Sequence, residues 1–119
     1  MPYRTFFTFF SVTLALLAYA NSAMAALEYI DCTPVEVVSL EQRIHVRCST
    51  GRNGVIYFSL GTSRNASETA FANRALQMGN MALVSGRPLA IRYESTDTSG
   101  TAIGCLATDC RLIQTIYLR

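Results

Sequence analysis

The sequence predicts a mainly β (α+β) domain with one helix, and the element order is that of a five-stranded OB-fold Greek-key barrel with the helix between strands 3 and 4. Two observations predict this class. Short segments with alternating apolar and polar residues recur along the chain, as in half-buried strands, and one longer central segment has helical spacing instead. The expected strands are residues 33–40, 43–49, 55–60, 89–94 and 110–118, and the helix is expected within residues 65–85.

The first 25 residues predict export. Residues 1–4 give a weakly positive start, residues 6–20 are apolar and uncharged, and Ala23-Met24-Ala25 has the small-x-small pattern of a signal-peptidase site. The apolar stretch is short for a membrane span, and no stop-transfer segment follows it. We expect a signal peptide over residues 1–25 and one domain over residues 26–119. The mature protein is then periplasmic or secreted, with no membrane span after cleavage.

Four cysteines in a small exported domain predict two disulfides. Cys32 and Cys48 lie symmetrically about residue 40, so an antiparallel hairpin that turns there would bring them opposite each other. By elimination, Cys105 then bonds to Cys110 and closes a short loop. Each bridge is expected to stabilise the fold by roughly 2–4 kcal/mol.

The first three expected strands form a meander. Residues 33–40 are rich in β-branched side chains, a polar turn follows at Glu41-Gln42, and residues 43–49 alternate strictly between apolar and polar positions. The alternation puts Ile44, Val46 and Cys48 inward and Arg43, His45 and Arg47 outward. Asn53-Gly54 favours a tight hairpin before the strand at residues 55–60.

The central segment has the start, face and stop of a helix. Asn65 followed by Glu68 resembles a capping box, and Ser67 is an alternative cap. Gly86 and Pro88 provide the usual stop. The expected apolar face consists of Phe71, Ala72, Ala75, Leu76, Met78, Gly79, Ala82 and Leu83.

Two strands and a loop complete the chain. Residues 89–94 alternate again, residues 95–104 have loop composition, and Leu112, Ile116 and Leu118 are the expected inward set of the last strand. Tyr57, Tyr93 and Tyr117 lie on strands. They could stack on sugars or bases, but they are expected to help fill the barrel with the hydroxyl at its rim.

The candidate ligand-binding residues are Arg43, His45 and Arg47. As an outward, basic, partly aromatic strip they suit phosphate, sulfate or carboxylate groups, including those on glycans, on a face where OB barrels carry ligands. The alternative is an ordinary solvated strand face.

Other chemistry is expected to be absent. One histidine without a free thiol gives no nucleophile–base pair, and the cysteine spacing is not that of a zinc finger. Glu94, Asp97 and Asp109 could act as paired carboxylates on glycosides, but they are interpreted as loop residues. We therefore expect no enzyme, no cofactor and no metal.

One segment carries a resemblance to a known family. After the small-residue helix, the chain reads Ser85-Gly86-Arg87-Pro88-Leu89-Ala90-Ile91-Arg92-Tyr93, and a loop, a late cysteine pair and a terminal strand follow. With the exported start and the three-strand lead-in, this resembles the binding subunits of the subtilase cytotoxin and typhoid toxin group and related small exported bacterial OB-fold proteins. The resemblance implies a non-enzymatic subunit that forms a homopentamer, accompanies a toxin A subunit and binds sialylated glycans. The family's sugar-binding serine has no counterpart in a matching context, so no family binding residue is assigned here.

The sequence thus predicts an exported binding module for a glycan or protein receptor. The first alternative is a monomeric periplasmic protein that modulates an envelope enzyme or complex. The second is a nucleic-acid-binding OB domain that uses the strip of Arg43, His45 and Arg47. Export argues against nucleic acid, as does the net charge of +1 that remains when Arg4 leaves with the signal.

Overall fold

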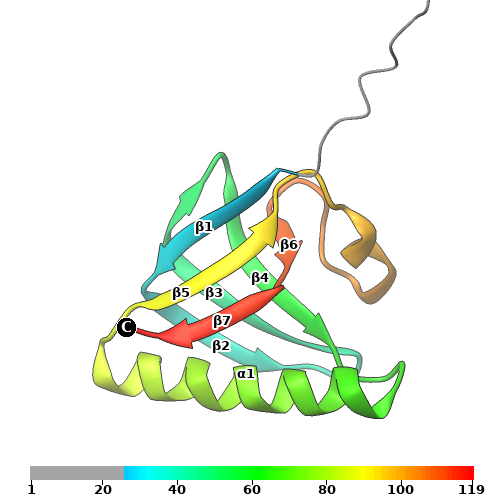
Figure 1. Cartoon of the computed structure of the whole chain (residues 1–119), viewed down its shortest axis with the longest axis horizontal. Helices are drawn as coiled ribbons and strands as arrows, with labels where there is room; N and C mark the ends of the chain where they lie inside the picture. Colours follow the sequence, from blue (N-terminus) through cyan, green and yellow to red (C-terminus); the bar gives the residue numbers. More distant parts are fainter. Residues whose placement is uncertain (1–25) are drawn as a thin grey trace, which may run out of the picture.

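The computed structural model describes residues 26–119, and the expected signal peptide over residues 1–25 lies outside the described residues. The described part is a mixed α+β fold with seven strands in two sheets, one α-helix and one short 3-10 helix (Figure 1). The elements are β1 (Leu27–Cys32), β2 (Pro34–Ser39), β3 (Arg43–Arg52), β4 (Val55–Gly61), α1 (Ala66–Ser85), β5 (Leu89–Glu94), η1 (Ser99–Ile103), β6 (Cys110–Leu112) and β7 (Thr115–Leu118).

The strands form a three-stranded sheet in the order β1-β5-β7 and a four-stranded sheet in the order β2-β3-β4-β6. All neighbours are antiparallel except β4 and β6. The chain crosses between the sheets at Thr33, which separates β1 from β2, and at Ile113-Gln114, which separate β6 from β7. At the second crossing, Ile113 N donates to Ser59 O of β4 and Gln114 N donates to Arg92 O of β5, each at 2.9 Å. These two short segments therefore tie the sheets together.

Residues 26–119 contain seven separate strands, where five were expected. β1 was not predicted because its apolar residues do not keep to one face. Ile30 and Cys32 pack into the core beside the half-buried Glu28, whereas Leu27 and Tyr29 are exposed on the other face. This outer strand is defined by its pairing with β5, which lies far away in the sequence. The strand expected over residues 110–118 is interrupted because the chain changes partner there, from β4 to β5.

The meander follows the predicted pattern. β2, β3 and β4 occupy the predicted segments, and β3 runs on to Arg52. Asn53 and Gly54 both have positive φ, 51° and 81°, as the two-residue hairpin turn requires. The disulfides are Cys32–Cys48, which joins the end of β1 to β3, and Cys105–Cys110. Both pairs are as predicted, the first from the hairpin and the second by elimination, although Pro34 and not Cys32 stands opposite Cys48 in the observed register.

Helix α1 begins and ends where its caps predict. The side-chain Oδ1 of Asn65 accepts a hydrogen bond from Glu68 N at 2.8 Å, and Gly86 takes the left-handed conformation just past the end. The capping box is only half formed, because the Glu68 carboxylate pairs with Arg64 Nε at 3.3 Å instead of turning back.

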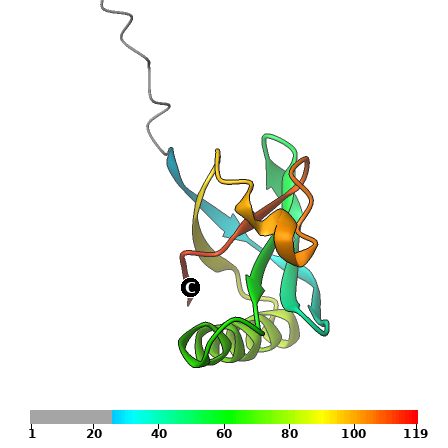
Figure 2. The same cartoon turned by 90° about the vertical axis from the view of Figure 1, so that its right-hand side faces the viewer.

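The buried face of α1 is made of small residues, so the helix lies close to the sheets. A Cβ at Gly79 would lie 3.3 Å from Val37 on β2. Phe71, Leu76 and Met78, the larger members of the predicted face, are only partly buried. The prediction is wrong for Leu83, which is 40% exposed. The fully buried residues of α1 are Ala72, Ala75, Gly79 and Ala82. Figure 1 shows α1 running along one side of both sheets, and Figure 2 shows it nearly end-on below the strands.

Of the strand tyrosines, Tyr93 alone fits the predicted role closely. It is 1% exposed, its ring packs edge-on against Phe58 at 4.9 Å between centroids, and its hydroxyl donates to Glu28 at 2.9 Å. Tyr57 is half-buried on the outer side of β4, and Tyr117 is 43% exposed. Tyr57 therefore belongs to the surface that carries the predicted strip.

Candidate functional site

The predicted basic strip lies on the outer face of β3. Ile44, Val46 and Cys48 are buried in the core, so the alternation of the strand turns the intervening side chains outward. Those side chains belong to Arg43, His45 and Arg47, all of which are half-buried.

Glu36 of β2 contacts two members of this strip. It is in register with Arg47 and lies diagonally across from His45. Its Oε1 is 2.8 Å from His45 Nε2, and its Oε2 is 3.7 Å from Arg47 Nε. The hydrogen bond from His45, opposed by desolvation and aided by the charge of Arg47, lowers the pKa of Glu36 below its ordinary value. Because Glu36 is therefore an ionised acceptor, the proton between them resides on His45 Nε2.

Arg43 is held at the other end of the strip by the loop after β5. Its Nη1 donates to Ile103 O of η1 at 2.9 Å, and its Nε is buried without a hydrogen-bond partner in the described residues. Gly104 has a φ of 87°, and a Cβ there would clash with the Arg43 guanidinium. Only glycine meets both the conformation and the close approach at this position.

The small disulfide loop forms a wall beside the strip. Cys105–Cys110 closes it, and Cys110 N donates to Leu106 O at 2.9 Å. The loop docks on β4 because Asp109 O accepts hydrogen bonds from both Ile56 N and Tyr57 N, each at 3.0 Å. Leu106 stays 63% exposed at the loop.

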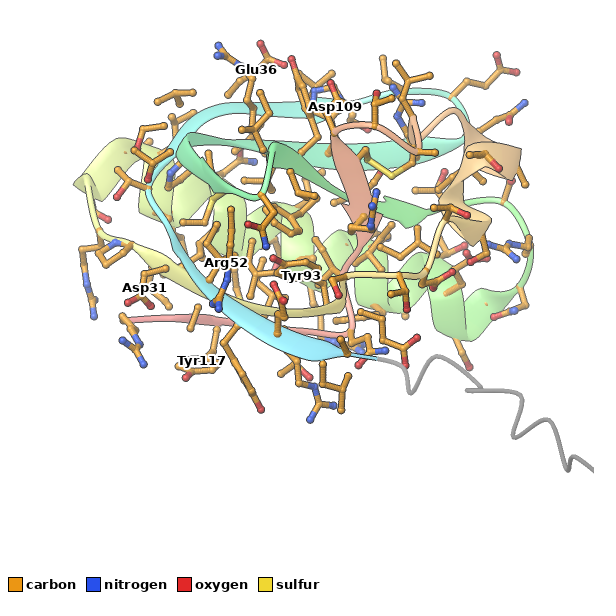
Figure 3. The ribbon with its side chains drawn as sticks, turned by 90° about the horizontal axis from the view of Figure 1, so that it is seen from above. Asp31, Glu36, Arg52, Tyr93, Asp109 and Tyr117 are labelled. Atoms are coloured by element: carbon orange, nitrogen blue, oxygen red, sulfur yellow. A yellow bond between two sulfur atoms is a disulfide. The ribbon has the colours of Figure 1, made fainter. Side chains whose placement is uncertain are left out.

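Sheet and loop enclose an open cavity of about 250 Å³. Its sheet side is lined by Glu36, His45 and Tyr57, and the ring of His45 meets that of Tyr57 edge-on at 5.4 Å. Its other lining residues are Arg43, Gly104, Leu106, Asp109 and Cys110. Figure 3 places Glu36 and Asp109 at the same margin of the molecule, and both residues line this cavity.

The sequence pattern found part of this site and missed the rest. Arg43 and His45 line the cavity, but Arg47 does not. Glu36, Tyr57 and Asp109 were not predicted to join them. The predicted hairpin, symmetric about residue 40, would place Glu36 opposite Ile44, whereas the observed register places it opposite Arg47.

The other predicted acidic residues do not form a pair with Asp109 in the cavity. Asp97 accepts a hydrogen bond from Ser99 N at 2.9 Å, and hydrogen bonds from the side chain and backbone of Ser99 lower its pKa. This is the turn role expected for it. Glu94 ends β5 opposite Leu27 of β1.

A second concavity, of about 460 Å³, lies at the end of α1 and is largely apolar. Met81, Val84 and Leu118 line it, and the Val84 side chain is 89% exposed. Exposed apolar clusters of this kind often mark contacts with other proteins.

Within residues 26–119, no three histidine, cysteine or acidic side chains come together as a metal site requires. No helix of this described range is long and apolar enough to cross a membrane. Comparison of the chain with protein-family models and with curated protein sequences finds no match.

Proposed function

We propose that this protein is an exported, non-enzymatic binding module that holds a glycan in the cavity between the β2–β4 face and the disulfide loop. The observation that carries the proposal is the cavity itself. Two acidic residues, an arginine, a histidine and a tyrosine line a space of about 250 Å³, close to the lower end of small-molecule pockets. Sugars are bound by such combinations, because their hydroxyls need acceptors and donors while their C–H faces rest on rings.

We also propose that the two sheets are the halves of one OB-type barrel. In this interpretation β1 and β2 are one bent strand, β6 and β7 are another, and the strand pairs then link all five strands in a ring. β3 and β4 become the second and third strands, and residues 95–109 become the loop between the fourth and fifth. OB folds bind oligosaccharides between these same parts, which supports the cavity as the site.

The chemistry of the cavity favours binding over catalysis. A glycosidase needs a carboxyl with a raised pKa as general acid, whereas the pKa of Glu36 is lowered. His45 uses Nε2 on Glu36, and the described cysteines are all in disulfides. The two disulfides also fit an exported protein.

The apolar concavity at the end of α1 supports a homo-oligomer. A ring of copies, as in the toxin subunits that the sequence resembles, would bury Met81 and Val84 against a neighbouring copy and leave the glycan cavity open. A toxin A subunit or a protein of the bacterial envelope is the other partner that this surface would suit. The charges argue against nucleic acid, because Glu36 offsets the basic strip.

A solution titration tests the glycan proposal. The oxidised protein is titrated with soluble glycans by calorimetry, alongside Leu106→Ser in the cavity wall and Leu27→Ser on β1 as a matched exposed-leucine control. Binding that is lost in Leu106→Ser and kept in Leu27→Ser supports the proposal, whereas no binding by the wild-type protein refutes it. Light scattering separately tests the ring: Val84→Asp should convert an oligomer into monomers, and a monomeric wild-type protein contradicts the ring.

A further inference from the structure

The charges that face the cavity restrict which sugar it can hold. Glu36 and Asp109 both line it, while the only arginine in its lining is Arg43. Arg43 already donates to Ile103 O. Arg47 does not line the cavity, and its Nε lies 3.7 Å from Glu36 Oε2. A negatively charged ligand would therefore meet two acidic residues and one arginine, whose Nη1 is already bonded to Ile103 O.

Both carboxylates retain oxygen atoms that can accept hydrogen bonds. Asp109 forms no ion pair within residues 26–119, and its place in the loop is held by its backbone carbonyl. Glu36 Oε1 accepts from His45, but Oε2 is 3.7 Å from Arg47 Nε, too far for a hydrogen bond. Ionised carboxylates only accept, so they select ligand groups that donate.

The remaining lining suits an uncharged ring. Tyr57 and the exposed Leu106 offer apolar surface on the sheet side and the loop side of the cavity. The volume of about 250 Å³ matches one monosaccharide unit better than a branched or extended ligand.

We infer that the ligand is an uncharged sugar unit with free neighbouring hydroxyls, and that Asp109 and Glu36 are the residues that exclude acidic sugars. This inference rests on the proposed glycan-binding function. It reverses the expectation from the basic strip, which pointed to anionic groups, and it differs from the sialylated ligands implied by the sequence resemblance.

Matched pairs of sugars test the inference. The disulfide-bonded protein is titrated with the methyl glycosides of glucose, galactose and mannose, and with the corresponding methyl uronides, in which a carboxylate replaces the C6 hydroxymethyl group. At least one neutral glycoside should bind about tenfold or more tightly than its uronide, because a ligand carboxylate would lie near two like charges. Asp109→Asn keeps the side-chain shape and removes one charge, so it should shrink this ratio mainly by improving uronide binding. Glu41→Gln, an exposed change of the same charge at the β2–β3 turn, should leave the ratio unchanged.

The outcomes separate this inference from the proposed function. Uronides that bind as tightly as the neutral glycosides, or more tightly, overturn the inference but leave a glycan-binding protein. A neutral preference of unchanged size in Asp109→Asn overturns the role given to Asp109. If no member of either set binds, the proposed function itself fails.

Discussion

His45 Nε2 lies 2.8 Å from Oε1 of Glu36, although Glu36 stands opposite Arg47, not His45, in the β2–β3 register. This diagonal contact converts an apparently basic strand face into a mixed one. Glu36 Oε2 lies 3.7 Å from Arg47 Nε, which is too far for a hydrogen bond. The cross-strand pair of Glu36 and His45 thus contributes two of the polar residues that line the cavity.

Replacing Glu36 should remove part of the pH dependence of stability. The pKa of Glu36 is lowered on folding, so its contribution is present above the ordinary value of 4.5 and is lost as the pH falls through the folded value. Wild type should therefore be more stable than Glu36→Gln at pH 7, and the difference should vanish in acid. Urea unfolding of both proteins between pH 7 and pH 3 measures this difference in the free energy of unfolding. A constant difference over that range would contradict the assigned ion pair.

Removing either disulfide should lower stability, but only one of the two removals should affect glycan binding. Cys32 and Cys48 are 16 residues apart and Cys105 and Cys110 are 5 apart. On loop-closure entropy, replacing the first pair by serine should cost about 3 kcal/mol and the second about 2 kcal/mol. Chemical denaturation measures both costs. Only the second replacement should abolish glycan binding, because that bridge closes the cavity wall. Equal effects on binding would show that the wall is not part of the site.

The helix cap at Asn65 predicts that two nearby alanine substitutions differ in their effect on stability. Asn65→Ala removes the acceptor for Glu68 N and should destabilise the protein by about 1 kcal/mol. Ser67→Ala, two residues further on, lies within the helix and should change stability little. Thermal or urea unfolding of both variants distinguishes the caps, and a larger loss in Ser67→Ala would identify Ser67 as the true cap.

The hydroxyl of Tyr93 should ionise at an unusually high pH. Burial, reinforced by the hydrogen bond to Glu28 and the charge of Glu28, raises the pKa of Tyr93 to about 12. Its stabilising effect is present below the ordinary value of 10.0 and is lost as the pH rises toward 12. The tyrosinate absorbance of wild type minus that of Tyr93→Phe should show one phenol ionising near 12. A difference curve centred near 10 would be inconsistent with the buried contact.

The local part of the fold could be predicted from the sequence, and the non-local part could not. Alternation, Asn53-Gly54, and the caps Asn65 and Gly86 act over a few residues, so β2 to β5 and α1 were placed close to their observed bounds. β1 has apolar side chains on both of its faces, and the crossing at Ile113-Gln114 depends on two distant strands. Neither feature produces a regular pattern of apolar and polar residues in the sequence.

Only the part of the candidate site that depends on local sequence could be predicted. The outward set of β3 follows from alternation alone. Glu36 joins it through strand pairing, and Asp109 joins it through a loop that is closed by a disulfide and docked on β4. The mixed charge of this surface depends on these contacts, because they bring negative charge to a strand whose own outward residues are basic.

The most direct test of the central claim maps ligand binding on the protein by NMR. Backbone amide shifts of the oxidised protein are followed while the neutral methyl glycosides are added. The glycan-site proposal predicts that the perturbed amides cluster at His45, Tyr57, Gly104, Leu106 and Asp109, with those around Val84 unchanged. Perturbation centred on Met81 and Val84, or no perturbation at any sugar concentration, would contradict it.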